Sequence, residues 1–182
     1  MKKLCGLFWE QPDFNPKQLI CVALEAEAKY IPDKFWELFN QILVTDIGRQ
    51  NAEKSLRNFF LEKHTRRVFS CGFAGGLNPN LKVGDVVFET ADENLRAGLL
   101  RVGATPAIFF CTDRIATTVA EKQKLRAETG ADAVEMESAV IHEICREHGI
   151  PCATVRVISD TAHEDLPLDF NALSKPDKNL DF

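Results

Sequence analysis

Apolar and polar positions along the chain follow two alternating patterns. Short runs rich in β-branched and aromatic residues, each bounded by Gly, Pro or polar residues, predict strands at residues 19–24, 41–45, 67–71, 85–89, 107–111 and 152–159. Apolar residues at helical spacing predict helices at residues 51–63, 119–128 and 135–148. The polar, proline-containing residues 165–182 predict a surface loop with at most a short helix. Together these elements predict an α/β fold, a three-layer αβα sandwich with a central mixed, mostly parallel sheet.

The last predicted helix has a carboxylate on its apolar side. Glu137 lies there because the apolar residues Ile141 and Cys145 follow it by four and eight positions. Charged residues occupy the opposite, solvated side, namely Glu143, Arg146 and Glu147. A buried carboxylate is costly unless a hydrogen-bond donor meets it. Glu137 therefore either binds helix amides or a buried arginine, or accepts hydrogen bonds from a ligand such as the paired hydroxyls of a ribose.

The last predicted strand carries two charged residues on one face. Arg156 lies within the strand and Asp160 follows it, about 13 Å away, which is too far for a direct ion pair. Arg156 therefore needs another partner, for which Glu27 and Glu137 are candidates. Asp160 stands at the carboxyl end of a parallel strand, the edge at which open α/β sheets bind ligands. It either belongs to such a site or only caps the next turn.

A segment of small residues, CGFAGGLNP at residues 71–79, lies between two predicted strands. Small side chains allow a ligand to approach the backbone closely. The segment has neither the GxGxxG spacing of a dinucleotide site nor the lysine of a P-loop. Alone, it indicates either a ligand-binding turn or a tight connection.

Composition and charge narrow the class of protein. The 182 residues, 45% hydrophobic and 27% charged, predict a single domain over residues 1–182. The net charge of −5 and the scattered basic residues exclude a broad nucleic-acid surface. No apolar run approaches the roughly 18 residues of a membrane span. The N-terminal apolar run is too short for a signal peptide, so we expect a cytoplasmic protein.

Cysteine and histidine patterns argue against disulfides and metals. The six cysteines include no CxxC pair, and most lie in predicted strands, which predicts buried thiols at Cys5, Cys21, Cys71, Cys111, Cys145 and Cys152. His142 and His148 are six residues apart rather than four as in an HExxH zinc helix, so we expect no metal site. We expect His163 to be a solvated loop residue.

Four segments of the chain together resemble one enzyme family: ALEAE at residues 23–27, GFAGGLNPNLKVGD at 72–85, AVEMESA at 133–139 and VRVISD at 155–160. They are similar to the purine nucleoside phosphorylase and uridine phosphorylase superfamily, especially its branch that cleaves methylthioadenosine and S-adenosylhomocysteine. The resemblance spans most of residues 19–169 and implies a phosphorylase/hydrolase-like fold. It also implies one nucleoside phosphorylase-like domain, shortened in the middle and at the C-terminus.

The resemblance implies roles for individual residues. Glu27 would position or activate the attacking water, Glu137 would hold the ribose hydroxyls, and Asp160 would donate a proton to purine N7. Met136 would pack under the sugar, and Arg156 would support the site. Further substrate-binding residues that the resemblance implies are Glu135, Phe73, Ala74, Gly75, Ser159, Asp113 and Ile115.

The implied activity is cleavage of the N-glycosidic bond of a purine, adenine-type nucleoside, by water or by phosphate. No cofactor is implied, and phosphate would enter only as a co-substrate. The alternative is a catalytically impaired relative that binds a nucleoside or an adenosyl lipid. The family also implies a homodimer or a higher homo-oligomer. Aromatic residues could furnish its interface or simply a core, among them Trp9, Phe35, Trp36, Phe59 and Phe60.

Several features bear on the choice between water and phosphate. Phe73 stands where relatives usually carry a Ser or Thr, and Ser70 stands near the arginine of one phosphorylase branch, so both favour water. Arg49, Arg66 or Arg114 could supply positive charge from elsewhere. A similarity to the hopanoid-associated phosphorylases, which release adenine from an adenosyl lipid, favours phosphate; it lies in residues 109–115, 121–126 and 173–177.

Overall fold

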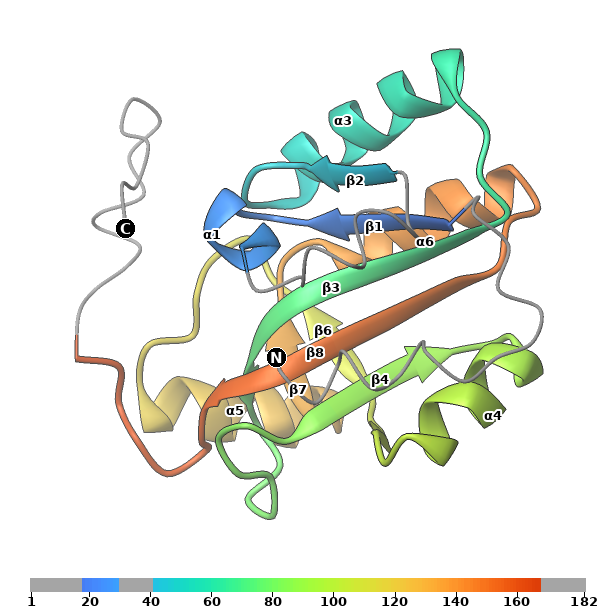
Figure 1. Cartoon of the computed structure of the whole chain (residues 1–182). Coiled ribbons are helices and arrows are strands. Elements are labelled where there is room, and N and C mark those ends of the chain that lie inside the picture. The colour runs from blue at the N-terminus through green and yellow to red at the C-terminus, as the bar shows by residue number, and fades with distance from the viewer. Residues whose placement is uncertain (1–17, 30–40, 168–182) are drawn as a thin grey trace.

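The structure, a computed structural model, describes residues 18–29 and 41–167. Its strands are β1 (Gln18–Val22), β2 (Gln41–Val44), β3 (Arg67–Gly76), β4 (Val86–Thr90), β5 (Thr105–Pro106), β6 (Phe109–Cys111), β7 (Ala133–Glu135) and β8 (Cys152–Asp160). Within the described ranges they form one eight-stranded sheet, with six strands in the order β2-β1-β3-β8-β4-β5 (Figure 1). At the end of β3 the sheet continues through β7 to β6.

The sheet is mixed and mostly parallel, as the sequence predicts. Among the described strands, β1 pairs in parallel with β2 and β3, and β3 pairs in parallel with β8. β4 runs antiparallel to β8, and β7 runs antiparallel to β3. The parallel strands β1, β3 and β8 therefore end at the same edge, where we expect a ligand site.

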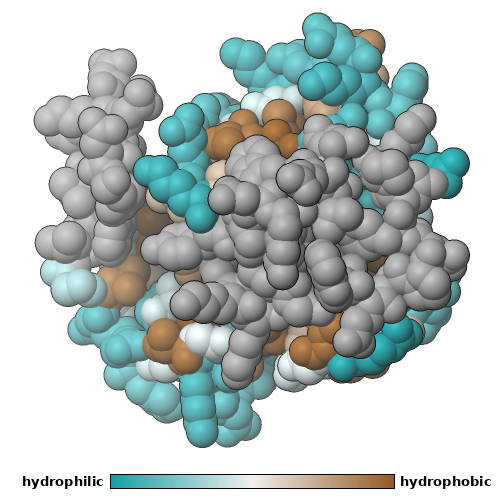
Figure 2. Space-filling view, in the orientation of Figure 1, coloured by the Kyte–Doolittle hydropathy of each residue, from teal (hydrophilic) through white to brown (hydrophobic). Residues whose placement is uncertain are grey.

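Helices cover both faces of the sheet, which confirms the three-layer fold. On one face α3 (Arg49–Glu62) and α6 (Ser138–Glu147) pack against β1 and β3, through a cluster that includes Leu19, Ala52, Leu56, Val68 and Ile144. On the other face α4 (Glu93–Arg101) packs through Phe69, Phe88, Leu95, Leu99 and Val155. The outer side of α3 is largely hydrophilic and forms the top of the view in Figure 2. Two further helices of the described ranges, α1 (Glu25–Ala28) and α5 (Val119–Thr129), lie near the carboxyl ends of β1 and β8.

The buried side of α6 is the one that its periodicity predicts. Val140, Ile141, Ile144 and Cys145 are buried, whereas Glu143, Arg146 and Glu147 are exposed. Full burial of an aliphatic side chain such as Ile144 contributes roughly 1.5–3 kcal/mol. The predicted start of this helix at residue 135 is wrong, because residues 133–135 form β7 and the helix begins at Ser138. Pairing with β3 and β6 makes this short segment a strand.

The glycine-rich segment is also not the turn that the sequence predicts. β3 continues through it to Gly76, and Gly72 and Ala74 pair with Arg156 and Ile158 of β8. The register shifts between Ala74 and Gly75, which bends the strand at the edge of the sheet. The small residues therefore form the end of a central strand rather than a loop. The sequence also missed α1, α4 and β5.

The cysteines that the structure describes, at positions 21, 71, 111, 145 and 152, are free, and three of them are buried. Burial raises the pKa of the Cys71 thiol to about 12. None of the helices in residues 18–29 and 41–167 is long and apolar enough to cross a membrane. Phe59 and Phe60, both on α3, pack against the core. Predictions for residues 1–17, for Phe35 and Trp36, and for most of the tail fall outside the described residues.

Candidate active site

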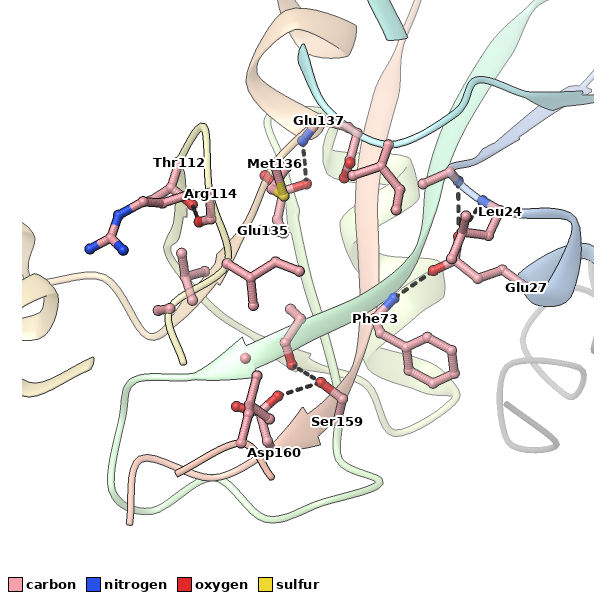
Figure 3. Close-up of a pocket in the computed structure, with 18 residues that line it drawn as sticks. Leu24, Glu27, Phe73, Thr112, Arg114, Glu135, Met136, Glu137, Ser159 and Asp160 are labelled. Carbon is pink, nitrogen blue, oxygen red and sulfur yellow. Dashed lines mark hydrogen bonds between the residues drawn. The ribbon is translucent and has the colours of Figure 1, made fainter. Parts of the chain in front are cut away.

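A cavity of about 320 Å³ opens at the edge where β1, β3 and β8 end (Figure 3). Segments far apart in sequence line it: residues 23–24 and 27, Ile47, residues 73–75, 112, 114–116, 134–137, 159–160 and Leu166. Glu27, Glu137 and Asp160 reach it from different sides (Figure 3). Its volume suits a small ligand. Three carboxylates that the sequence singled out thus meet around one space.

Glu27 is held by three backbone N–H groups. One carboxylate oxygen accepts hydrogen bonds from Ala23 N at 2.9 Å and Leu24 N at 3.0 Å, and the other accepts one from Phe73 N at 3.2 Å. The carboxylate lies so close to β3 that a Cβ on Gly72 would stand 2.6 Å from it. A side chain at this point of the strand would therefore displace the Glu27 carboxylate. The result is a carboxylate fixed at the cavity wall.

Glu135 and Arg156 form a buried ion pair behind the cavity. The guanidinium donates to Glu135 at 2.7 Å and to the Ser70 hydroxyl at 3.0 Å. Glu135 also accepts from Ser138 N at 2.9 Å and from Cys111. Burial opposes ionisation of Glu135, but Arg156 and these hydrogen bonds lower its pKa. Glu135 lines the cavity, as the resemblance implies, with its oxygens already engaged by the protein.

This pair adds a partner of Arg156 that the sequence interpretation missed. Of the two expected partners, Glu137 forms a longer ion pair with the guanidinium, at 3.8 Å, whereas no ion pair joins Arg156 to Glu27 among the described residues. The closest carboxylate is Glu135, at 2.7 Å. The predicted helix start concealed this partner, because it placed Glu135 on a helix rather than at the end of a strand next to β3.

Glu137 keeps one oxygen free for a ligand. Oε1 accepts a hydrogen bond from Gly48 N at 2.9 Å, at the beginning of α3. Oε2 has only the distant guanidinium of Arg156 near it among the contacts described. Burial raises the pKa of Glu137, and Arg156 partly opposes that rise. Met136 lines the cavity beside it (Figure 3).

Asp160 closes the opposite end of the cavity. Its Oδ1 accepts a hydrogen bond from the Ser159 hydroxyl at 2.6 Å, and that hydroxyl lies 3.2 Å from the carbonyl of Ala74. Its Oδ2 is buried and lies 2.6 Å from the ammonium of Lys122. The contact between Asp160 Oδ2 and the Lys122 ammonium is an ion pair without hydrogen-bond geometry. Lys122 could not be recognised from the sequence, because a lysine in a helix is typically solvated.

The other site predictions divide into two groups. Six of the residues that the resemblance implies for substrate binding line the cavity, namely Phe73, Ala74, Gly75, Ser159, Met136 and Ile115. Asp113 does not, although its neighbours Thr112 and Arg114 do. The exposed Asp113 is therefore not part of the described wall, so the geometry gives no support to its expected role in substrate binding.

Positive charge is scarce around the cavity. Arg114 is the only basic residue among the described lining residues, and it pairs with Glu121 and points away from the space (Figure 3). Arg49 pairs with Glu143 on the surface, and neither Arg49 nor Arg66 reaches the described wall. In residues 18–29 and 41–167 no group of three or more His, Cys, Asp or Glu could hold a metal ion. The site is dominated by carboxylates.

Comparison with known proteins gives consistent matches. A family model described as "Phosphorylase superfamily" matches residues 88–177. An aminodeoxyfutalosine nucleosidase of Campylobacter jejuni is 26% identical over 158 residues, 69% of each chain. A 5'-methylthioadenosine/S-adenosylhomocysteine nucleosidase of Glaesserella parasuis is 27% identical over 164 residues, 71% of each chain.

Solved structures agree with the fold. The crystal structure of a Campylobacter jejuni 5'-methylthioadenosine/S-adenosyl homocysteine nucleosidase superposes with a TM-score of 0.72 at 22% identity, covering 87% of this chain and 91% of that one. A mutant of the Helicobacter pylori nucleosidase with 5'-methylthioadenosine in its active site gives a TM-score of 0.71 at 20% identity, with the same two coverages. At such identities the likeness establishes the fold.

Proposed function

Because this chain belongs to the phosphorylase superfamily and is an enzyme acting on nucleosides, we propose that it hydrolyses the N-glycosidic bond of a purine nucleoside. The observation that best supports this proposal is the meeting of Glu27, Glu137 and Asp160 around one cavity. Cleavage of the bond leaves positive charge on the sugar ring, which nearby carboxylates stabilise.

Each of the three carboxylates has its own part in the proposed reaction. Asp160 gives a proton to N7 of the base, and the electron pair of the C1′–N9 bond leaves with the base. Water held against Glu27 adds to C1′ and passes a proton to that carboxylate, so the products are free base and free sugar. Proton exchange with solvent restores both side chains. Glu137 accepts hydrogen bonds from the ribose hydroxyls.

Gly75 lies beside the proposed acid. A Cβ at this position would lie 3.2 Å from the Val134 side chain and 3.3 Å from Asp160 Oδ2. Any side chain at this position would therefore crowd the proposed acid and displace its carboxyl group. Glycine leaves Asp160 in place, and we propose that the base lies with N7 toward it.

Water is favoured over phosphate by the charges of the wall. A phosphate dianion would be repelled by the negative charges of Glu27, Glu137 and Asp160. Arg114 is the only lysine or arginine among the described lining residues, and it is already paired with Glu121. The amide of Phe73, which could otherwise bind an anion, donates to Glu27 instead. Phe73 itself supplies no hydroxyl. We therefore assign the nucleophile as water.

Free base should form at the same rate with and without phosphate. The measurement is chromatography of the products after incubation with adenosine, 5'-methylthioadenosine, inosine or an adenosyl lipid, and the sugar product should be the free sugar. Formation of a sugar 1-phosphate only when phosphate is present would contradict the choice of water. Absence of base release from every one of these substrates would contradict the proposed function.

Replacing Glu137 with glutamine should raise KM for a ribonucleoside more than it lowers kcat. The amide has one acceptor oxygen, so it cannot accept hydrogen bonds from Gly48 N and from the ribose hydroxyls together, as the carboxylate does. A 2'-deoxynucleoside offers only one of the two hydroxyls, so its KM should change much less. Equal effects on both substrates would argue against a ribose contact.

The pH dependence of KM provides a second readout at this residue. Because burial raises the pKa of Glu137, its carboxylate form is lost at a higher pH than that of an exposed glutamate. We expect KM of the wild type to rise as the pH falls through that range, and the rise to be absent in the Glu137→Gln variant.

The alternative of a relative that only binds a nucleoside is not favoured, because all three carboxylates are in place. Formation of a homodimer or a larger homo-oligomer stays a prediction of the family resemblance. Light scattering of the purified chain measures it.

A further inference from the structure

Lys122 is a buried cation next to the proposed acid. It is the buried residue of α5, and its side chain has no exposed surface, whereas Lys124, two residues on, is 73% exposed. Removing an ammonium group from water is energetically costly, and the cost is recovered only where partners surround the group. A lysine at such a position therefore has specific partners.

The partners of Lys122 all belong to the end of β8 and the residues after it. Nζ donates hydrogen bonds to the carbonyls of Thr161 and Glu164, both at 2.8 Å. It also lies 2.6 Å from Asp160 Oδ2. The helix is tied to the same stretch at a second point, where Asp165 accepts a hydrogen bond from Val119 N at 2.6 Å. Lys122 thus links α5 to the segment that carries Asp160.

The contact leaves the two oxygens of Asp160 in different surroundings. Oδ2 is enclosed against the ammonium. Oδ1 accepts the hydrogen bond of the Ser159 hydroxyl at 2.6 Å and is the oxygen left to meet a base. The orientation of the carboxyl group in the cavity is therefore set from both sides, by Lys122 and by Ser159.

We propose that Lys122 is a positioning residue for the hydrolysis, acting through Asp160. Its ammonium group holds Oδ2, so that Oδ1 faces the base, and it balances the negative charge that stays on the carboxylate after the proton has moved to N7. Lys122 does not touch the substrate. The inference rests on the proposed function, because it assigns a part to Lys122 in the protonation of the leaving group.

The test compares two leaving groups. A purine needs a proton to leave, whereas p-nitrophenolate leaves from a p-nitrophenyl riboside as a stable anion. The Lys122→Met variant should lose about 10²-fold or more in kcat on a purine nucleoside, the range expected for loss of a positioned acid. Its kcat on the nitrophenyl riboside and its KM for the nucleoside should change little. The exposed Lys124→Met is the matched control on the same helix and should match the wild type on both substrates.

A double-mutant cycle provides an independent readout. In an Asp160→Asn background, Lys122→Met should cause no further loss of purine release, because its effect passes through Asp160. If Lys122→Met does not fold, Lys122→Gln is measured instead, since its amide retains hydrogens for the carbonyls of Thr161 and Glu164.

The outcomes separate this inference from the function on which it rests. If the wild type is active and a folded Lys122 variant loses kcat equally on both leaving groups, the role of Lys122 is overturned and the proposed function stands. Additive losses in the double-mutant cycle do the same. A wild type that is inactive on both substrates overturns the proposed function, and the role of Lys122 with it.

Discussion

Replacing Asp160 with asparagine should reduce base release from a purine nucleoside by about 10²- to 10⁴-fold in kcat. Asparagine keeps the shape of the side chain but has no acidic proton for N7. The Ser159 hydroxyl, 2.6 Å from Oδ1, can still donate to the amide oxygen, so the fold should be retained. The measurement is steady-state release of free base, with thermal unfolding of the same samples to verify the fold.

Asp113→Asn is the matched control for this substitution. Asp113 is exposed and lies outside the described wall, although Thr112 and Arg114 on either side of it line the cavity. It should therefore have the kcat and KM of the wild type. An Asp160→Asn variant that is folded and retains the kcat of the wild type would remove Asp160 from the mechanism.

The sequence predicted the parts of the fold that depend on local pattern. Strands with near-continuous apolar residues, such as β8, and a helix with one apolar side, such as α6, follow directly from periodicity. The position of Asp160 at the end of a parallel strand then located the ligand edge of the sheet. Periodicity did not lead to Glu27, which was placed in one site with Glu137 and Asp160 by the resemblance to the nucleoside phosphorylase family.

Elements that depend on pairing rather than pattern were not predicted. β7 has only three residues, and its strand conformation comes from its pairing with β3 on one side and β6 on the other. The end of β3 contains glycines, which weaken the strand signal because they have no side chain to pack. Its pairing with β8 maintains the strand through Ala74.

Partners of buried charges were the hardest part to predict. Arg156 was recognised as a buried cation, but its main partner, Glu135, is 21 residues away in sequence and lies at the end of the strand that was missed. The burial of Lys122 could not be predicted, because the sequence pattern of α5 is that of a solvated helix. Lys122 is buried only because the chain after β8 packs against it. Sequence periodicity identifies a buried face, but it does not identify what meets a charge there.

Replacing Arg156 with methionine should lower the free energy of unfolding by about 3–5 kcal/mol, the cost typical of breaking a buried ion pair from one side. Arg156 is 2% exposed, and its removal leaves the carboxylate of Glu135 buried without its cation. The hydrogen bond to the Ser70 hydroxyl, at 3.0 Å, is lost as well. Denaturant unfolding of both proteins measures the difference.

The pH dependence of the loss in unfolding free energy tests whether the unpaired Glu135 carboxylate causes it. In the wild type, burial favours the neutral form of Glu135, but the charge of Arg156 outweighs it together with the hydrogen bonds to the carboxylate, so the pKa is lowered. Ionised Glu135 therefore stabilises the fold above the ordinary pKa of glutamate, and this stabilisation is lost as the pH falls. Without Arg156, the buried carboxylate takes up a proton more readily, so the deficit should narrow as the pH is lowered. Glu135→Gln in the Arg156→Met background should recover part of the loss at neutral pH. Arg57→Met is the control, because it breaks an exposed ion pair with Glu147, and it should lower the free energy of unfolding far less. An equal loss of unfolding free energy in the two variants would show that burial of the charge is not the cause.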